Sequence, residues 1–331
     1  MATTFSPTQW LPFLEALDPE HFRASIAAAV VAVFNDGASG DPMVPYLTPA
    51  GDVGLYGPDS MTWRVHADLP SMMVGGIAAL MLQALHPLAM AGVDEHSDFR
   101  VDPLGRLRRT SAFVAAVTFG ATPLVEQHIA MVRAIHTRVT GIAADGRPYS
   151  ANDPELLTWV HTVEHGCFLW AYQRHSGRPL SAREIDQYLD EVAEVAIRLG
   201  AHWVPRTQEQ LESYFRRLRP QLYRGPQARR AFDFLEQGAF EDPVTRTIYA
   251  LQVRIAKATL PAWAQRAAGI ELFPFEEQLI TGPPFEVLAR LLRWAVGEPL
   301  PLVAARQRCG QAINAHPRHR RGPKLAAAPA A

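Results

Sequence analysis

The sequence predicts an all-α protein built as a single large helical domain. Apolar residues recur at the three- and four-residue spacing of a helix along most of the chain, and strand-like alternation is hardly visible. No internal repeat and no clear interdomain linker divides the 331 residues. Because 48% of the residues are hydrophobic and 20% are charged, the chain can bury a substantial core.

The first half of the chain is predicted to hold helices on both sides of one long loop. This loop, residues 36–57, is rich in glycine, proline and aspartate, which are typical of turns. One helix after the loop is apolar on all sides, as expected for a helix buried in a large core. The predicted helices are residues 10–17, 23–33, 71–91, 106–120 and 123–140.

Helix start signals mark the second half. After a turn-rich break at 141–150, residues 152–155 place a capping side chain, a first-turn proline and an acid at the start of a helix to residue 172. Ser181 and Glu184 have the spacing of a capping box, which opens a helix to residue 199. Further helices are predicted at 208–218, 226–235, 243–260 and 286–294.

Composition excludes several classes of protein. The formal net charge of -1 gives no argument for nucleic acid as a partner. Neither Cys167 nor Cys309 has a partner at C-x-x-C spacing, so no thiolate metal site is expected. No basic region followed by an apolar core begins the sequence, so a cytoplasmic protein is expected. Basic residues gather near the end, and residues 301–331 are predicted to be a flexible basic tail.

Residues 72–93 are nearly all apolar and long enough to cross a bilayer. The glycine pair Gly75-Gly76 and the His86-Pro87 step weaken or kink such a helix, and charged residues follow it at once. A helix in a buried core is therefore favoured, and membrane contact is left open without being predicted.

The segment 156–169 is expected to form a helix with His161 in an almost wholly apolar face. Glu164 and His165 share this face, because residues three and four positions apart are neighbours on a helix. Three interpretations of His161 stay open: a core histidine satisfied by hydrogen bonds, a metal ligand, or the axial ligand of a buried cofactor.

Residues 161–165 also match the H-x-x-E-H pattern of one group of zinc peptidases. His161 and His165 would bind zinc and Glu164 would activate water. The third ligand would come from Glu236 or Glu241, which the sequence supports only by assumption. This interpretation predicts a zinc hydrolase.

A second candidate site contains Arg106 and Arg109, which are three residues apart and share a helix face. Guanidinium groups stay charged when buried, so such a pair needs an anion. A haem propionate, a substrate carboxylate or phosphate, or a protein acid such as Asp98 or Asp102 would serve.

A dense polar and aromatic block precedes the apolar helix and contains Arg64 and His66. Gly75-Gly76 would let another backbone or a flat cofactor approach the helix closely. The irregular His86-Pro87 step suggests the wall of a site, since proline frees a carbonyl one turn back.

Together these blocks resemble the catalytic domain of the MpaB and latex-clearing rubber oxygenase family, a former domain-of-unknown-function family linked to b-type haem oxygenases. The resemblance covers about residues 51–199 and is loose beyond them. It assigns residues 36–300 to the catalytic domain, with 1–35 as N-terminal helices. The matching blocks are Gly54-Leu55-Tyr56-Gly57-Pro58-Asp59-Ser60-Met61-Thr62-Trp63, residues 80–91 with His86-Pro87, Arg106-x-x-Arg109-Thr110, and Trp159-Val160-His161.

The resemblance implies a non-covalent haem b in a buried pocket, with His161 as the proximal ligand of the iron. The family's distal arginine, lysine and threonine would fall on Arg106, Arg109 and Thr110. The sequence departs from the rubber-cleaving members here, because an arginine does not lose its proton and so cannot ligate iron. The catalytic acid of those members has no secure counterpart near Met90, and rubber cleavage is therefore not carried over.

Further contacts follow from the same resemblance. A ligating imidazole needs a partner for its other nitrogen, and Glu164 or a backbone carbonyl would serve His161. Arg64 and His86 are candidate contacts to the cofactor.

We therefore expect an oxidoreductase, a haem-dependent oxygenase that acts with dioxygen on an apolar small molecule. Arg106, Arg109 and Thr110 would be its catalytic distal groups. The alternatives are the zinc hydrolase, a non-enzymatic carrier of haem or an apolar ligand, and a purely structural helical protein. The sequence gives no indication of the oligomeric state.

Overall fold

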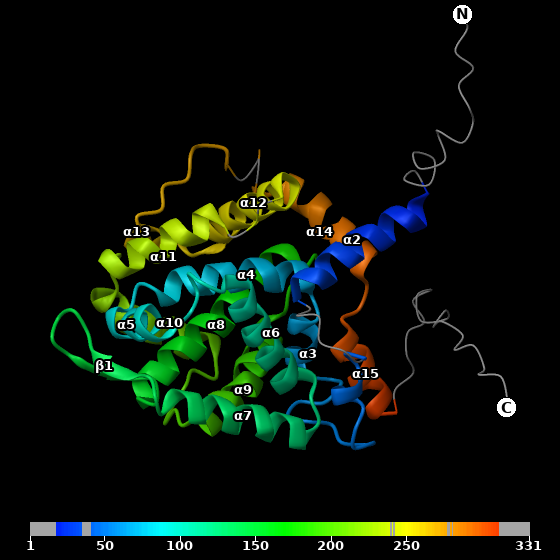
Figure 1. The fold of residues 1–331 in the computed structure, drawn as a ribbon, viewed down its shortest axis with the longest axis horizontal. Coiled ribbons are helices and arrows are strands. Elements are labelled where there is room, and N and C mark those ends of the chain that lie inside the picture. The colour runs from blue at the N-terminus through cyan, green and yellow to red at the C-terminus, as the bar shows by residue number, and fades with distance from the viewer. Residues whose placement is uncertain are drawn as a thin grey trace, which may run out of the picture.

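The computed structural model describes residues 18–34, 41–238, 240, 242–276, 279 and 281–310. Within these residues the regular secondary structure is helical apart from one short hairpin, and the all-α prediction is confirmed (Figure 1). The elements of the first half are α2 (Pro19–Phe34), η2 (Val44–Tyr46), α3 (Met61–His66), α4 (Leu69–Gln83), α5 (Pro87–His96), α6 (Pro103–Phe119), α7 (Thr122–His136), β1 (Thr140–Ile142) and β2 (Pro148–Ser150). Those of the second half are α8 (Pro154–His175), α9 (Ala182–Leu199), α10 (Gln208–Leu218), η3 (Arg219–Gln221), α11 (Pro226–Gln237), α12 (Pro243–Thr259), α13 (Ala262–Ala268), α14 (Pro283–Val296) and α15 (Leu300–Arg308).

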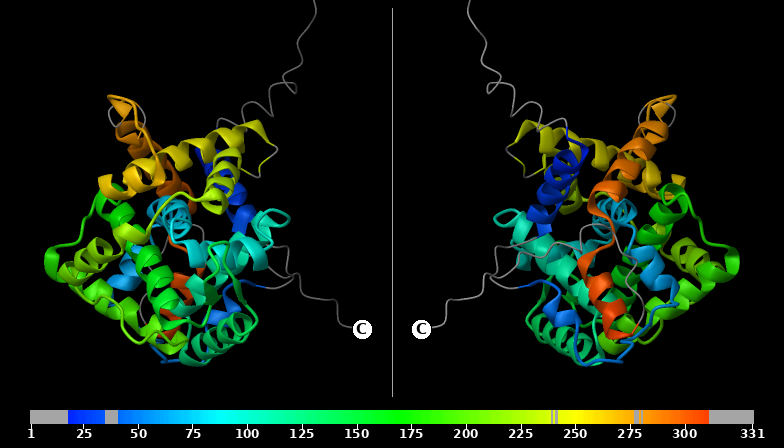
Figure 2. Two further views of the ribbon diagram at one scale, coloured as in Figure 1. Left: turned by 90° about the vertical axis from the view of Figure 1, so that its left-hand side faces the viewer. Right: turned by 90° about the vertical axis from the view of Figure 1, so that its right-hand side faces the viewer.

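The helices α4 and α8 form the centre of the molecule. They pack along each other, α12 lies across α4, and α3 and α9 pack against the other side (Figure 1). Figure 2 shows α2 beside α14, so helices near the two ends of the chain are neighbours. The core between these layers is filled by large aromatic side chains that are almost fully buried, among them Trp159, Phe215 and Phe232.

Capping signals in the sequence predict correctly where several helices begin. Ser181 and Glu184 form the predicted capping box, and α9 ends at Leu199 as expected. Asp153 caps α8 by accepting hydrogen bonds from the backbone N–H groups of Glu155 and Leu156. Local chemistry is sufficient at these positions because the capping contacts lie within one turn. The predicted helix at 10–17 lies outside the described residues.

The single helix predicted over 71–91 is wrong, because the chain breaks between α4 and α5 and the two helices meet at 106°. Pro87 disfavours a helical backbone at His86, whose φ and ψ of -87° and 116° are extended. His86 instead caps α5 by accepting from the N–H of Ala89. No single helix of the described residues is long and apolar enough to span a bilayer, and only this bent pair passes that test jointly.

The prediction of a flexible tail from residue 301 is wrong for its first part. Leu300–Arg308 forms α15, and Leu302 and Ala305 pack with Trp63 and Phe119. Arg308 is only 3% exposed and donates to the backbone carbonyls of three residues, Tyr46, Asp52 and Phe119. A guanidinium that serves several carbonyls can be buried without a carboxylate partner.

The break predicted at 141–150 is a β-hairpin. β1 and β2 pair antiparallel, with Gly141 opposite Tyr149. Strands of three residues are too short for alternation to be visible in sequence.

Candidate functional site

Two histidines of α8 lie stacked in the protein core. The rings of His161 and His165 have centroids 4.1 Å apart and are tilted by 31°. Each residue is 9% exposed. The stacking follows from their four-residue spacing, as the sequence predicts.

His165 has a fixed tautomer. Its Nδ1 lies 3.1 Å from the backbone oxygen of His161. Because a carbonyl oxygen only accepts, Nδ1 must carry the proton, and Nε2 of the neutral ring therefore keeps its lone pair.

A third imidazole extends the stack. His66, at the end of α3, has its ring centroid 5.7 Å from that of His165. Its Nδ1 lies 2.8 Å from the Thr118 hydroxyl oxygen, and its Nε2 lies 3.1 Å from the Tyr188 hydroxyl oxygen. Thr118 belongs to α6 and Tyr188 to α9, so this residue ties three helices together.

Burial keeps the three imidazoles neutral. It lowers the pKa of His66 and of His161 well below 6.5, and it lowers the pKa of His165 to about 4. A neutral imidazole is the form that ligates a metal ion. The His161 ring nitrogens form no hydrogen bond within the described residues, and the backbone oxygen of His161, not its ring, is what His165 contacts.

Glu164 is a half-buried acid without a partner among the described residues. Its side chain makes no hydrogen bond or ion pair within the part of the chain that the structure describes, so the contact to His161 expected from the sequence is not formed. Desolvation raises the pKa of its carboxyl to about 7. Glu164 therefore binds and releases a proton near neutral pH.

The two glycines of α4 have different surroundings. A Cβ on Gly75 would lie 3.0 Å from the carbonyl oxygen of Cys167 and from Cα of Phe168, whereas a Cβ on Gly76 would have Phe168 as its nearest neighbour at 4.0 Å. Gly75 thus allows the close packing of α4 on α8. Gly76 belongs to an apolar stripe of α4 in which Met72, Met73 and Ile77 are half-buried and Leu80 is exposed.

The α6 residues singled out in the sequence are more open. Arg106 is half-buried with its guanidinium 5.7 Å from the centroid of Phe99, and it has no carboxylate partner among the described residues. Burial and the neighbouring charge of Arg109 lower the pKa of Arg106. Arg109 is exposed and pairs with Asp102 at 3.2 Å, and Thr110 is exposed. The structure does not bring these side chains into contact with the histidines.

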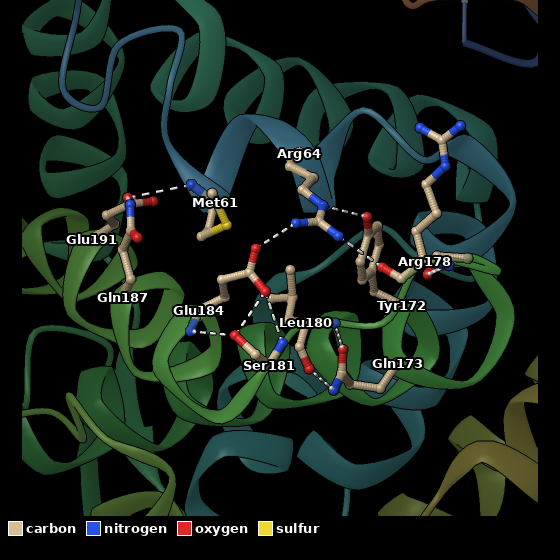
Figure 3. Close-up of polar contacts among 11 residues, drawn as sticks. Met61, Arg64, Tyr172, Gln173, Arg178, Leu180, Ser181, Glu184, Gln187 and Glu191 are labelled. Atoms are coloured by element: carbon tan, nitrogen blue, oxygen red, sulfur yellow. Dashed lines mark hydrogen bonds and ion pairs between the residues drawn. The ribbon is translucent and has the colours of Figure 1, made fainter.

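Arg64 and His86, both expected at a cofactor, are engaged by protein groups. Arg64 donates to the Tyr172 hydroxyl, the Glu184 carboxylate and the carbonyl of Arg178, as Figure 3 shows. His86 packs with its ring centroid 5.4 Å from that of Trp159. These contacts account for both side chains without a ligand.

The zinc interpretation lacks a third ligand. No group of three His, Cys, Asp or Glu side chains within the described ranges could hold a metal ion. Glu236 pairs with Lys257 at 2.8 Å, and Glu241 lies outside the described residues. A structural zinc site has four ligands and a catalytic one has three from the protein, so the H-x-x-E-H match makes no complete zinc centre within the residues that the structure describes.

Comparison with known families gives one match. A model described as "ER-bound oxygenase mpaB/B'/Rubber oxygenase, catalytic domain" covers residues 63–294, which is most of the chain. The chain belongs to this family. No curated protein and no solved structure matches it. The family is an oxygenase catalytic domain, and the matched range contains all three stacked histidines.

The sequence patterns indicate His161 and His165, but they predict no role for His66, Thr118 or Tyr188. Tyr188 lies on the buried face of the amphipathic α9, which is the one sequence signal for it. Its partner lies more than one hundred residues away, and periodicity carries no information about such a contact.

Proposed function

We propose that this chain is a haem-b-dependent oxygenase that acts with dioxygen on an apolar small molecule, with His161 as the axial ligand of the iron. The observation that carries the proposal is a buried, neutral imidazole whose ring nitrogens have no partner within the described residues. A lone pair that accepts no hydrogen bond from the protein is available to coordinate a metal ion. The family, an oxygenase catalytic domain, supports the same reaction class.

His161 and the apolar residues of α4 would supply the ligand and the wall that a haem group needs. When bound, haem b supplies the iron that activates dioxygen. His161 would offer a lone pair from a ring that stays neutral at every pH near physiological values. The apolar stripe of α4, which includes the half-buried Gly76 and the exposed Leu80, would form an apolar wall that excludes water and contacts the substrate.

The two arginines of α6 would play different roles. Arg109 already has the carboxylate of Asp102 as its partner. Arg106 is half-buried without a carboxylate partner in the described part of the chain, so it is the residue that would bind a propionate or another anionic group. The Thr110 hydroxyl lies one turn further along the same helix and would donate a hydrogen bond on that side.

An absorption spectrum of the purified protein tests the cofactor. Protein produced with a haem precursor, or cofactor-free protein titrated with hemin, is expected to show a Soret band at one haem per chain. His161→Ala should abolish retention of haem. His175→Gln is the matched control, because His175 is a buried histidine of the same helix that bonds to Thr259.

Three outcomes would change the proposal. A preparation that stays colourless after addition of hemin rejects it, and stoichiometric haem in His161→Ala rejects this ligand. Haem binding without dioxygen consumption across a broad panel of alkenes and isoprenoids would indicate a carrier.

A further inference from the structure

The orientation of the His161 ring needs an explanation. A ligating imidazole is usually held by a hydrogen bond from its second nitrogen, and such a bond is absent here among the described residues. The closest ring to His161 is that of His165, at 4.1 Å. This ring contact limits the rotation of the His161 side chain.

His165 is itself held from several sides. Its Nδ1–H donates to the carbonyl of His161, one turn back on α8. Phe168 packs edge-on against its ring, with centroids 5.8 Å apart and an interplanar angle of 78°. His66 lies against it from α3, at 5.7 Å and 36°.

His66 is the fixed end of this stack. Both of its ring nitrogens have hydroxyl partners, Thr118 at 2.8 Å and Tyr188 at 3.1 Å. One nitrogen of a neutral imidazole donates and the other accepts, and a hydroxyl can do either, so both bonds form together. Both hydroxyl-bearing residues are at most 1% exposed, which keeps water from replacing them.

We infer that His66, anchored by Thr118 and Tyr188, is a positioning residue that acts through His165 to set the orientation of the His161 ring. The inference rests on the proposed function, since it concerns how His161 presents its lone pair to haem. It adds a role for three residues from three further helices. Residues of this kind commonly change metal affinity by about 10- to 100-fold when they are replaced.

Removal of single hydroxyl groups tests the inference. Tyr188→Phe keeps the ring and removes the contact to His66, and Thr118→Val keeps the shape and removes the other contact. Each variant is expected to weaken hemin binding about tenfold and to shift the spectrum of the bound haem. Thr118→Ser, which restores a hydroxyl, should recover both properties. Tyr214→Phe is the control, because Tyr214 is 1% exposed and lies outside the stack.

A measurement without haem separates positioning from a loss of packing. Imidazole nitrogen NMR of the cofactor-free protein should report the Nδ1–H tautomer of His165. Tyr188→Phe should shift the signals of His161, although the two side chains do not share a hydrogen bond. Thermal melting of each variant shows whether the fold is retained.

The failure of this inference differs from that of the proposed function. Wild-type protein that binds no hemin overturns both. Wild-type protein that binds hemin, with Tyr188→Phe and Thr118→Val equal to it in affinity, spectrum and His161 signals, overturns the positioning role alone.

Discussion

The two helices that carry the candidate site residues differ in how completely their side chains are enclosed. On α8, His161 and His165 are buried, neutral and in contact with each other. On α6, Arg109 and Thr110 are exposed, and Arg106 has no carboxylate partner in the described part. Packing within the protein thus fixes the α8 side chains of the proposed site. The α6 side chains would complete their contacts only with a ligand.

The largest expected difference between the two helices is in stability. Phe168→Ala should cost about 3–5 kcal/mol of unfolding free energy, because Phe168 is 5% exposed and packs on His66, His165 and α4. Arg109→Ala should cost less than about 1 kcal/mol, since it breaks an exposed ion pair. Urea unfolding of the cofactor-free variants measures both. Equal losses would contradict the contrast between the helices.

The close approach of α4 to α8 gives a second, smaller test. Gly75→Ala would place a Cβ 3.0 Å from backbone atoms of Cys167 and Phe168, and overpacking of this kind costs about 1–3 kcal/mol. Gly76→Ala has room, with its nearest neighbour at 4.0 Å, and should stabilise the helix by up to about 1 kcal/mol. Opposite signs in thermal melting are expected. A stabilising Gly75→Ala would show that the two helices are less tightly packed.

A pH dependence distinguishes the acid of α8 from its histidines. The pKa of Glu164 is raised from 4.5 to about 7 in the folded protein, so the stability it contributes is complete below pH 4.5 and is lost as the pH rises through 7. For His165, whose pKa is lowered from 6.5 to about 4, the contribution is complete above pH 6.5 and is lost as the pH falls through 4.

Glu164→Gln should therefore stabilise the cofactor-free protein more at pH 8 than at pH 5. The difference is expected to be on the order of 1 kcal/mol once solvent screening is allowed for. Denaturant unfolding at the two pH values measures it. A variant with the same gain at both values would indicate that the carboxyl is ionised in the folded protein throughout this range.

Local signals in the sequence predicted much of the fold. The Ser181 and Glu184 capping box and the Asp153 cap act within one turn, and both helices begin where these signals lie. The break at His86-Pro87 was missed because continuous apolar composition favoured one long helix. Similarly, α15 was taken for a tail because its arginines suggested solvent, whereas Arg308 is held by backbone carbonyls from distant segments.

The candidate site is predictable only in part, because only some of its contacts are local in the sequence. The stack of His161 and His165 follows from a four-residue spacing, and the family follows from blocks in order along the chain. The contacts of His66 with Thr118 and Tyr188 join residues that only the folded chain brings together. Roles for Arg109 and Thr110 at a cofactor stay predictions.

The corner between α4 and α5 also fixes how many residues can lie between these two helices. Pro87 cannot donate to the carbonyl of Gln83, which instead accepts from the N–H of His86 at 3.2 Å and from the indole N–H of Trp159 at 3.4 Å. The carbonyl of Leu85 accepts from the N–H of Tyr223 at 3.0 Å. One inserted residue would turn α5 by about 100° relative to α4 and pull these oxygens away from their donors. Insertions and deletions among homologues should therefore spare this corner and accumulate at the exposed turn between β1 and β2.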